Sequence, residues 1–448
     1  MEVKGLRRDF THYVSLNAIA MLGFSFYVLA DTFFIAYYIG ADGLAALSLA
    51  LPVFYIAING PGILLGIGSA ALFSISIGKR QFKRASQYSQ TALATGVIYA
   101  LALTALFWLF RDEVCRLMGA EGQIFYYVRD YLSYLVTFTL AFVLFQVFLA
   151  TLRNDGSPRI AMVAMLVGNL VNTVFDWFLM GPLDMGLDGA ALATGASPLS
   201  SLLVVVIHFF KDDRYLSLRP FKPDFSLLPA IARTGLPAFI TDASNGVSTY
   251  AFNRMILFIA NALAVSAYSI ILNTALVIVY ILTGIAQGVQ PLLSLYFGRG
   301  EPDAVRRLWQ WAIRTMLVAS VCIVVVGEVF APAIVSLFNT QGDAALQALA
   351  TPGMRYYYLA FIPMALNILA VNALAAVTDA RSSVILSLCR ALVFPIPVVI
   401  ILGNAFHLTG VWLTIPLAEG LTFLVFLVLY RHSRLAQGKS VPVTQSLE

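Results

Sequence analysis

Charged residues are scarce in this chain of 448 residues. Asp, Glu, Lys and Arg make up 11% of it, whereas soluble domains carry roughly 25%. Apolar residues account for 60%, so too few charges remain to cover a globule of this size in water. The composition therefore argues against a water-soluble protein and favours one that lies in a membrane.

Cysteine and histidine are also rare, which limits the chemistry that the chain can perform. The three cysteines (Cys115, Cys322 and Cys389) lie far apart in apolar stretches, as core residues do, and give neither a disulfide framework nor a metal-binding spacing. The sequence has no Ser-His-Asp or His-Glu-x-x-His pattern and no phosphate-binding Gly-x-x-x-x-Gly-Lys-Ser/Thr loop. We therefore expect no enzyme activity, no cofactor, no ATP-driven step and no nucleic-acid partner. A cleavable signal peptide is not expected either, because the N-terminus is charged and the apolar run behind it is too long.

Long apolar segments dominate what is present. A membrane-spanning helix needs about 20 apolar residues, and twelve segments reach that length. They are residues 11–39, 44–76, 88–110, 124–150, 160–181, 188–210, 232–260, 263–297, 308–331, 354–377, 384–405 and 410–430. Prolines inside them, such as Pro52 and Pro395, predict kinks, which membrane helices tolerate. The sequence thus predicts an all-α integral membrane protein with twelve transmembrane helices.

Lysine and arginine are concentrated in alternate loops. Of the 28 such residues, 23 flank the same side of the spans, Arg390 among them. The other five are Arg111, Arg116, Arg129, Arg254 and Arg355. Positively charged loops stay in the cytoplasm. This distribution predicts a multi-pass protein of the plasma (inner) membrane with both termini in the cytoplasm.

Weak internal repeats relate the two halves of the chain. Residues 187–189 (LDG) begin the sixth span, and residues 408–410 (LTG) begin the twelfth. The separation between these two motifs, here called the repeat offset, also places Ser48 on Ser269. Six spans per half give both halves the same topology, so we expect two pseudo-symmetric six-helix bundles related by an axis along the membrane normal. The predicted domains are an N-terminal lobe (1–210), a cytoplasmic linker without a fold of its own (211–231), a C-terminal lobe (232–435) and a cytoplasmic tail (436–448).

Four motifs stand out along the chain. They are residues 31–35 (DTFFI), 152–159 (LRNDGSPR), 172–176 (NTVFD) and 284–291 (GIAQGVQP), of which 152–159 are the most specific. These motifs resemble the multidrug and toxic compound extrusion (MATE) family, and in particular its proton-coupled prokaryotic branch. The likeness extends over nearly the whole chain. It implies two six-helix lobes that face a central cavity, and antiport of H⁺ or Na⁺ against amphipathic, often cationic drugs.

Ionisable residues that we place near the middle of the bilayer are few, and each is costly enough there to be a functional candidate. They are Asp31, Asp176, Asp242, Arg254, Glu328 and Glu419. Tyr27 precedes Asp31, and Asn172 precedes Asp176, by one helical turn, so each pair shares a helix face. Depth along the spans places these four residues, Tyr131 and Thr194 in one layer of the outer half of the first lobe.

This polar layer predicts a cation-coupling site. Two neighbouring carboxylates in a low dielectric cannot easily both ionise, so one can load a proton outside and release it inside. Alternatively, Na⁺ could be bound by oxygens of Asp31, Asn172, Asp176 and Thr194. The MATE resemblance implies the acidic pair, the asparagine and the threonine at these positions. Tyr27 and Tyr131 match the family by spacing alone.

The polar layer has no copy in the second half of the chain. Shifted by the repeat offset, Asp31 falls on Phe252 and Asp176 on Pro397. A layer that only held one lobe together could be expected in both halves, so the asymmetry favours a functional role. Residues that bind the substrate stay unassigned.

The remaining charges within the spans allow structural explanations. Arg254 and Glu419 lie at similar depths in spans seven and twelve, and we expect them to pair. Glu328 is expected to reach the outer surface. For Asp242, a structural hydrogen bond and a functional role are both open.

Three classes of function compete. The first is a secondary multidrug efflux antiporter, expected as a monomer whose partners are membrane lipids and small-molecule drugs or toxic organic compounds. The second is a lipid-linked oligosaccharide or polyisoprenoid flippase, which needs a cationic cavity for phosphates, whereas Arg254 alone is assigned to a span. The third, a membrane-embedded enzyme or receptor, needs a convergent nucleophile, a metal-ligand set or a large soluble domain, and the sequence shows none of these.

Overall fold

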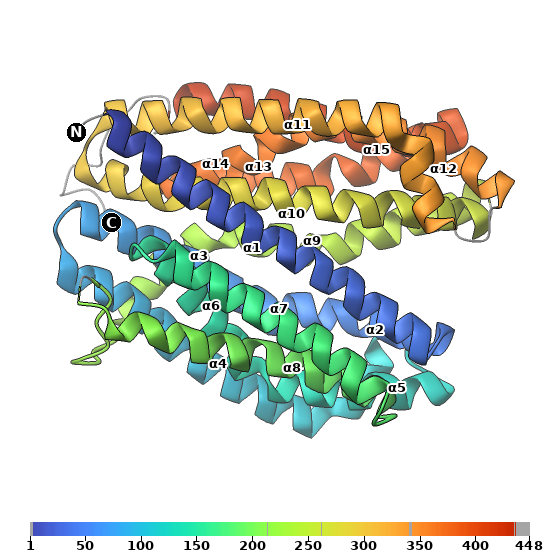
Figure 1. The fold of residues 1–448 in the computed structure, drawn as a ribbon, viewed down its shortest axis with the longest axis horizontal. Coiled ribbons are helices and arrows are strands. Elements are labelled where there is room, and N and C mark those ends of the chain that lie inside the picture. The colour runs from blue at the N-terminus through green and yellow to red at the C-terminus, as the bar shows by residue number, and fades with distance from the viewer. Residues whose placement is uncertain (1–2, 213, 261, 340–342, 434, 436–448) are drawn as a thin grey trace. The chain divides into compact units, whose positions relative to one another are not determined.

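Every regular element in the part of the chain that the computed structural model describes, residues 3–212, 214–260, 262–339, 343–433 and 435, is helical (Figure 1). In chain order the elements are α1 (Val3–Tyr38), α2 (Ala41–Val53), the π-helical turn η1 (Phe54–Asn59), α3 (Gly60–Gly78), α4 (Phe82–Leu117), α5 (Gly122–Thr137), α6 (Thr139–Asn154), α7 (Pro158–Met180), α8 (Gly186–Val205), the 3-10 turns η2 (Val206–Phe210) and η3 (Phe225–Leu227), α9 (Leu228–Ile259), α10 (Ala262–Arg299), α11 (Pro302–Phe338), α12 (Ala344–Tyr358), α13 (Phe361–Ala376), α14 (Ala380–Leu388), the π-helical turn η4 (Cys389–Val393) and α15 (Pro395–His432).

The helices have the length and composition of membrane spans. Within the described residues, eight helical segments qualify, or up to ten if each of two bent helix pairs is counted as one span. One of the eight, Ala380–His432, has 53 residues, far more than the roughly 20 that one span needs. Its backbone breaks at His407 (φ 51°, ψ −135°), between predicted spans eleven and twelve. These features confirm the predicted all-α membrane class, and α9 covers the predicted seventh span.

Two of the predicted spans are bent, and they occupy equivalent places in the repeat. α5 and α6 meet at 50°, and α12 and α13 at 47°. α5 ends at Thr137 and α12 at Tyr358, which the repeat offset superposes. The same offset relates the end of α4 at Leu117 to the end of α11 at Phe338. The offset predicted from the sequence therefore reappears both in helix ends and in the position of the bends.

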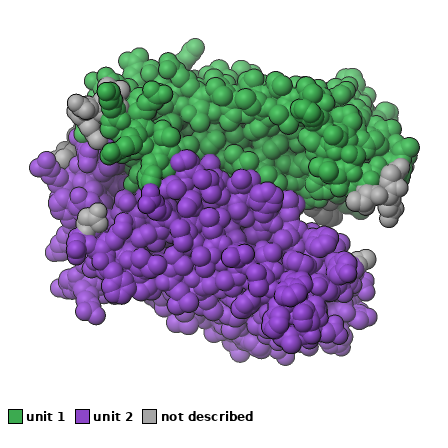
Figure 2. All heavy atoms as spheres, viewed as in Figure 1, with its two compact units in different colours: residues 1–14, 244–293, 300–448 green, residues 15–243, 294–299 purple. Residues whose placement is uncertain are grey.

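The chain divides into two compact units (Figure 2). Unit 1 comprises residues 1–14, 244–293 and 300–448, and unit 2 comprises residues 15–243 and 294–299. The boundaries fall inside α1, α9 and α10, so the lobe boundaries at residues 210 and 232 stay a prediction. All six residues of the predicted polar layer belong to unit 2.

Each unit is held by helix packing that follows from its apolar sequence. In unit 2, α7 packs along α8, and α3 packs against α4 and α6. In unit 1, α11 packs against α12 and α13, and the Trp309 ring contacts the rings of Phe426 and Tyr430 on α15. Pro158 and Pro302 stand in the first turns of α7 and α11, where a missing backbone N–H costs nothing.

The connecting segment after α8 has little helix, yet hydrogen bonds fix it to unit 2. The backbone N–H groups of Tyr215 and Leu216 donate to the two carboxylate oxygens of Asp155, at 2.8 and 2.9 Å. Gln90 on α4 accepts from the Lys222 N–H at 2.8 Å and donates to the Ser217 carbonyl at 2.7 Å. The segment predicted as a linker is therefore tied both to the loop of residues 152–159 and to α4.

Candidate functional site

Four helices of unit 2 carry the predicted polar layer. Tyr27 and Asp31 lie on α1, Asn172 and Asp176 on α7, Tyr131 on α5 and Thr194 on α8. α8 packs against both α5 and α7. α1 approaches α7 so closely that a Cβ on its Gly23 would overlap the Leu166 side chain. These contacts bring together segments that lie far apart in the sequence.

The structure places all six predicted residues in one cluster. Asp31 and Asp176 interact electrostatically with each other and with the phenols of Tyr27 and Tyr131. On the other side of the cluster, the Asn172 amide donates to the Thr194 hydroxyl at 3.4 Å. The predicted layer is thus a spatial cluster, while the role of its members stays a prediction.

Several oxygens of this cluster are buried without a hydrogen-bond partner among the described residues. They are Asp31 Oδ1, Asn172 Oδ1 and both carboxylate oxygens of Asp176. Asp176 and Asn172 are fully buried. A buried acceptor without a donor costs roughly 1–3 kcal/mol, and more when it is charged. The cluster therefore offers oxygen acceptors to a proton or a small cation.

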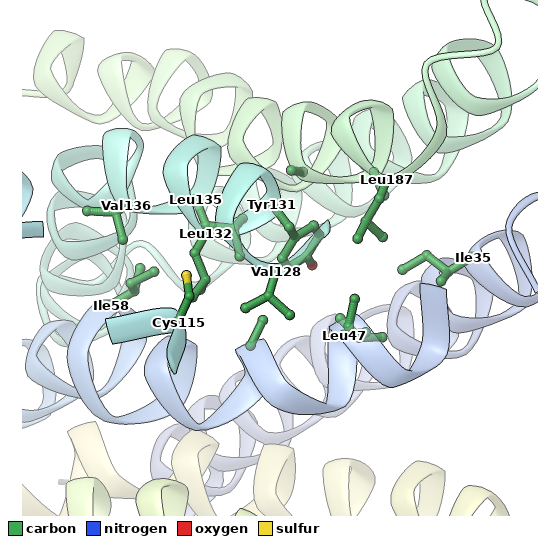
Figure 3. Close-up of a cluster of buried hydrophobic side chains, with 14 of the residues drawn as sticks. Ile35, Leu47, Ile58, Cys115, Val128, Tyr131, Leu132, Leu135, Val136 and Leu187 are labelled. Atoms are coloured by element: carbon green, nitrogen blue, oxygen red, sulfur yellow. The ribbon is translucent and has the colours of Figure 1, made fainter. Parts of the chain in front are cut away.

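An apolar cluster lies next to these polar groups and includes the ring of Tyr131 (Figure 3). In the close-up, Val128 and Leu132 from α5 and Leu187 from α8 lie beside that ring, and Ile35 from α1 lies further away in the same cluster. Tyr131 itself is only 3% exposed. Apolar surroundings lower the local dielectric and strengthen the interaction between the nearby carboxyl groups.

Tyr55 also belongs to the cluster, although no role was predicted for it. It lies on η1 and interacts electrostatically with Asp31, as well as with Tyr27 and Tyr131. It interacts in addition with Asp242 on α9. From the sequence, Tyr55 was only an aromatic residue within a span. Its place in the polar layer could not be predicted, because the depth of a residue in a π-helical turn does not follow from α-helical spacing.

Asp242 forms a second polar group in unit 2 with two amides that the sequence did not single out. Asn59 Nδ2 donates to Asp242 Oδ2 at 3.2 Å, and Gln146 Nε2 donates to Asn59 Oδ1 at 2.8 Å. The three residues come from α9, η1 and α6. The sequence signal for this polar group was an amide side chain within an apolar segment. A search limited to charged residues does not find such a side chain.

The predicted pairing of Arg254 with Glu419 is wrong. In unit 1, Arg390 Nε donates to Glu419 Oε1 at 2.8 Å, and Asn367 Nδ2 donates to Glu419 Oε2 at 2.7 Å. Arg254 is exposed. Arg390 was counted among the charges on the cytoplasmic side, but it lies on η4 inside the apolar segment Ala380–His432. Glu328 is half exposed and lies 3.9 Å from Arg355, while its place at the outer surface stays a prediction.

The chain is similar in sequence to known proteins. The model of the MatE family matches residues 17–178 and 237–401. A multidrug export protein, MepA, of Staphylococcus aureus (strain MRSA252) is 26% identical over 407 residues, which cover 90% of this chain and 88% of that protein. The MepA protein of Staphylococcus saprophyticus is 25% identical over 396 residues, which cover 88% of this chain and 86% of that protein.

Solved structures show the same fold. A crystal structure of a MATE protein in complex with MaL6 superposes with a TM-score of 0.91 at 23% identity and covers 97% of this chain and 98% of that one. An outward-facing multidrug resistance MATE transporter of the MOP superfamily gives a TM-score of 0.89 at 23% identity, with 97% of each chain covered. At this identity the likeness supports the architecture of the chain.

Proposed function

Because the chain belongs to the MatE family of transporters, we propose that it is a secondary active multidrug efflux antiporter. It would export amphipathic or cationic organic compounds in exchange for H⁺ or Na⁺. The names of the staphylococcal relatives, multidrug export proteins, support small organic molecules as cargo. We expect it to work as a monomer in the plasma (inner) membrane, with both termini in the cytoplasm and without a cofactor or an enzymatic step.

One observation carries the coupling part of this proposal. Both carboxylate oxygens of Asp176 are buried without a fixed hydrogen-bond donor among the described residues, and a second carboxyl group, Asp31, lies within hydrogen-bonding reach. Two such acceptors repel each other when both are ionised. A proton shared by them, or Na⁺ bound by them with Asn172 and Thr194, would supply the missing positive partner.

Alternating access links this site to export. With its cation bound, the carboxylate pair loses its repulsion and its cost in the bilayer falls. A rocking of the two lobes would then respond to the cation, because a ligand shifts a conformational equilibrium by the difference in its affinity for the two states. Release of the cation on the cytoplasmic side would reset the protein for the next molecule of drug.

Efflux from proteoliposomes under an imposed pH or Na⁺ gradient tests the site. We expect Asp31→Asn and Asp176→Asn each to reduce gradient-driven efflux to near the rate without a gradient, because an amide cannot exchange a cation as a carboxylate does. Glu328→Gln is the matched control, since its side chain is 41% exposed and lies outside the cluster, and it should transport normally. Undiminished coupled efflux in both aspartate variants would contradict the assigned site.

Gradients applied singly separate the two ions. If Na⁺ is the coupling ion, Thr194→Val should lower efflux driven by a Na⁺ gradient, because it removes an oxygen ligand without a large change in side-chain size. If H⁺ is the coupling ion, efflux should follow the pH gradient, and adding Na⁺ should not change it.

The flippase alternative is not favoured. A flippase for lipid-linked sugars needs positive charge that is free to hold phosphate groups. Arg390 is a second arginine within an apolar segment, but its guanidinium already pairs with Glu419 at 2.8 Å. The relatives named above are multidrug export proteins.

A further inference from the structure

Two consecutive hydrogen bonds lead from Gln146 through Asn59 to the carboxyl group of Asp242. Gln146 donates to the Asn59 carbonyl oxygen at 2.8 Å, and the Asn59 amide nitrogen donates to Asp242 Oδ2 at 3.2 Å. Because the acceptor side of Asn59 is occupied by Gln146, its donor side is fixed toward Asp242. This orientation gives the Asp242 carboxyl group a fixed hydrogen-bond donor on one of its oxygens.

The backbone of η1 holds Asn59 in place. The turn is π-helical, a form found mostly as single turns at functional sites. The Tyr99 hydroxyl donates to the Ala57 carbonyl at 2.8 Å and so satisfies a carbonyl in this turn. A Cβ on Gly60, the next residue after η1, would lie 2.7 Å from the Phe239 ring of α9. The turn and α9 are therefore packed closely together at the residue that follows Asn59.

Asp242 lacks a cationic partner among the described residues, and this distinguishes it from Glu419, which pairs with Arg390. Its side chain is partly exposed, whereas Asp176 is fully buried. A carboxylate inside a membrane helix is costly unless a positive group compensates it. Asp176 and Asp242 thus differ: Asp176 is buried without a fixed donor, and Asp242 has a donor and an accessible side.

Tyr55 connects the two acidic groups. It stands one turn before Asn59 on η1 and interacts electrostatically with both Asp31 and Asp242.

We propose that Asp242, oriented by Asn59 and Gln146, binds the positively charged group of organic cation substrates. The inference rests on the proposed export function and names the substrate subsite for it, separate from the Asp31/Asp176 pair that binds the coupling ion. A lipophilic monovalent cation fits best, because its charge compensates Asp242 and its apolar part suits the surrounding span.

Equilibrium binding of tetraphenylphosphonium to the purified full-length protein, without any gradient, tests this assignment. We expect Asp242→Asn to weaken binding at least about tenfold, the equivalent of one charge-assisted contact. Asp242→Glu should keep most of the affinity, and Asn59→Leu should weaken binding because it removes the orienting donor. Asp31→Asn and Asp176→Asn should weaken binding clearly less than Asp242→Asn does, and the control Glu328→Gln should bind like the parent.

The outcomes separate this inference from the export function. Unchanged binding in Asp242→Asn, or no binding by the parent, would overturn it. An equal loss in Asp31→Asn and Asp176→Asn would also overturn it, by assigning the organic cation to that pair. The export function depends on gradient-driven efflux instead, so it can stand when the binding result is negative. Thermal unfolding of each variant identifies any loss of binding that comes from misfolding. If Asp242→Asn does not fold, Asp242→Glu tests the proposal instead, because loss of binding by this variant in its folded state would also contradict it.

Discussion

Arg390 and Glu419 form an ion pair that is shielded from solvent, with side-chain exposures of 14% and 6%. Removing two charges from water is expensive, and good geometry with additional hydrogen bonds is needed to compensate. The second carboxylate oxygen of Glu419 receives such a bond from Asn367 at 2.7 Å. The pair is therefore satisfied internally, which makes it a structural feature of unit 1, in contrast to the unsatisfied oxygens of Asp176 in unit 2.

A double-mutant cycle should show this coupling. Arg390→Met or Glu419→Gln alone should lower the free energy of unfolding by about 3 kcal/mol, because each leaves a buried partner uncompensated. The double variant should lose clearly less than the sum of the two. Unfolding in detergent with increasing denaturant provides the measurement.

Arg254 supplies the control for that cycle. Because it is exposed and does not pair with Glu419, Arg254→Met combined with Glu419→Gln should be additive within about 0.5 kcal/mol. Additivity in the Arg390 cycle together with coupling in the Arg254 cycle would show that the pairing in the structure is incorrect.

At the scale of elements, glycine lets helices of unit 2 approach each other closely. A Cβ on Gly235 of α9 would overlap the Leu64 carbonyl of α3, and a Cβ on Gly68 of α3 would overlap the Ile231 carbonyl of α9. Small residues at such contacts are how membrane helices pack, because van der Waals contact replaces the hydrophobic effect inside the bilayer. The contact also holds the start of α9, the helix that carries Asp242.

Gly235→Ala should therefore destabilise the protein. The added methyl group meets backbone rather than a movable side chain, so we expect a loss of about 1–3 kcal/mol, as overpacked cores show. Gly420→Ala in α15 is the matched control, because nothing lies within 4 Å of its Cβ position. It should be neutral or slightly stabilising, since alanine favours helix over glycine. Thermal unfolding of the purified variants compares the two, and equal effects would contradict the close approach of α3 and α9.

The helices were predictable because apolar length determines a membrane span, and the polar layer was predictable because depth follows from the rise per residue. The pairing of residues on different helices was harder to predict from the sequence. One residue of error at a helix end turns a side chain by about 100°, since a turn holds 3.6 residues, so Glu419 could be assigned to Arg254 instead of Arg390. The bend at Phe138 depends on packing, and no proline marks it. Pro52 predicted a kink in the second span, but not that the turn Phe54–Asn59 behind it would be π-helical.

On the scale of the whole molecule, the repeat is close in backbone and divergent in chemistry. α1 ends at Tyr38 and α9 at Ile259, which the repeat offset again superposes. Yet Phe252, the repeat counterpart of Asp31, is buried and stacks on Tyr268 with ring centroids 5.5 Å apart. One unit thus places an acid where the other places packed aromatic rings. Two related helical frameworks with one acidic site are consistent with a single coupling site per molecule.

The repeat also predicts how the loops face the two sides of the membrane. The turns at Gln81 and Glu301 join equivalent helices, α3 to α4 and α10 to α11, and both lie among lysines and arginines. If each half crosses the membrane six times, both turns face the cytoplasm. Glu121, between α4 and α5, should face outward.

In a variant whose three native cysteines are replaced, Gln81→Cys and Glu301→Cys should react only with a membrane-permeant thiol reagent in intact cells. Glu121→Cys should react with an impermeant one. Labelling of Gln81→Cys and Glu301→Cys from opposite sides would mean an odd number of spans per half and would refute the parallel repeat, whereas labelling of both from outside would reverse the orientation alone.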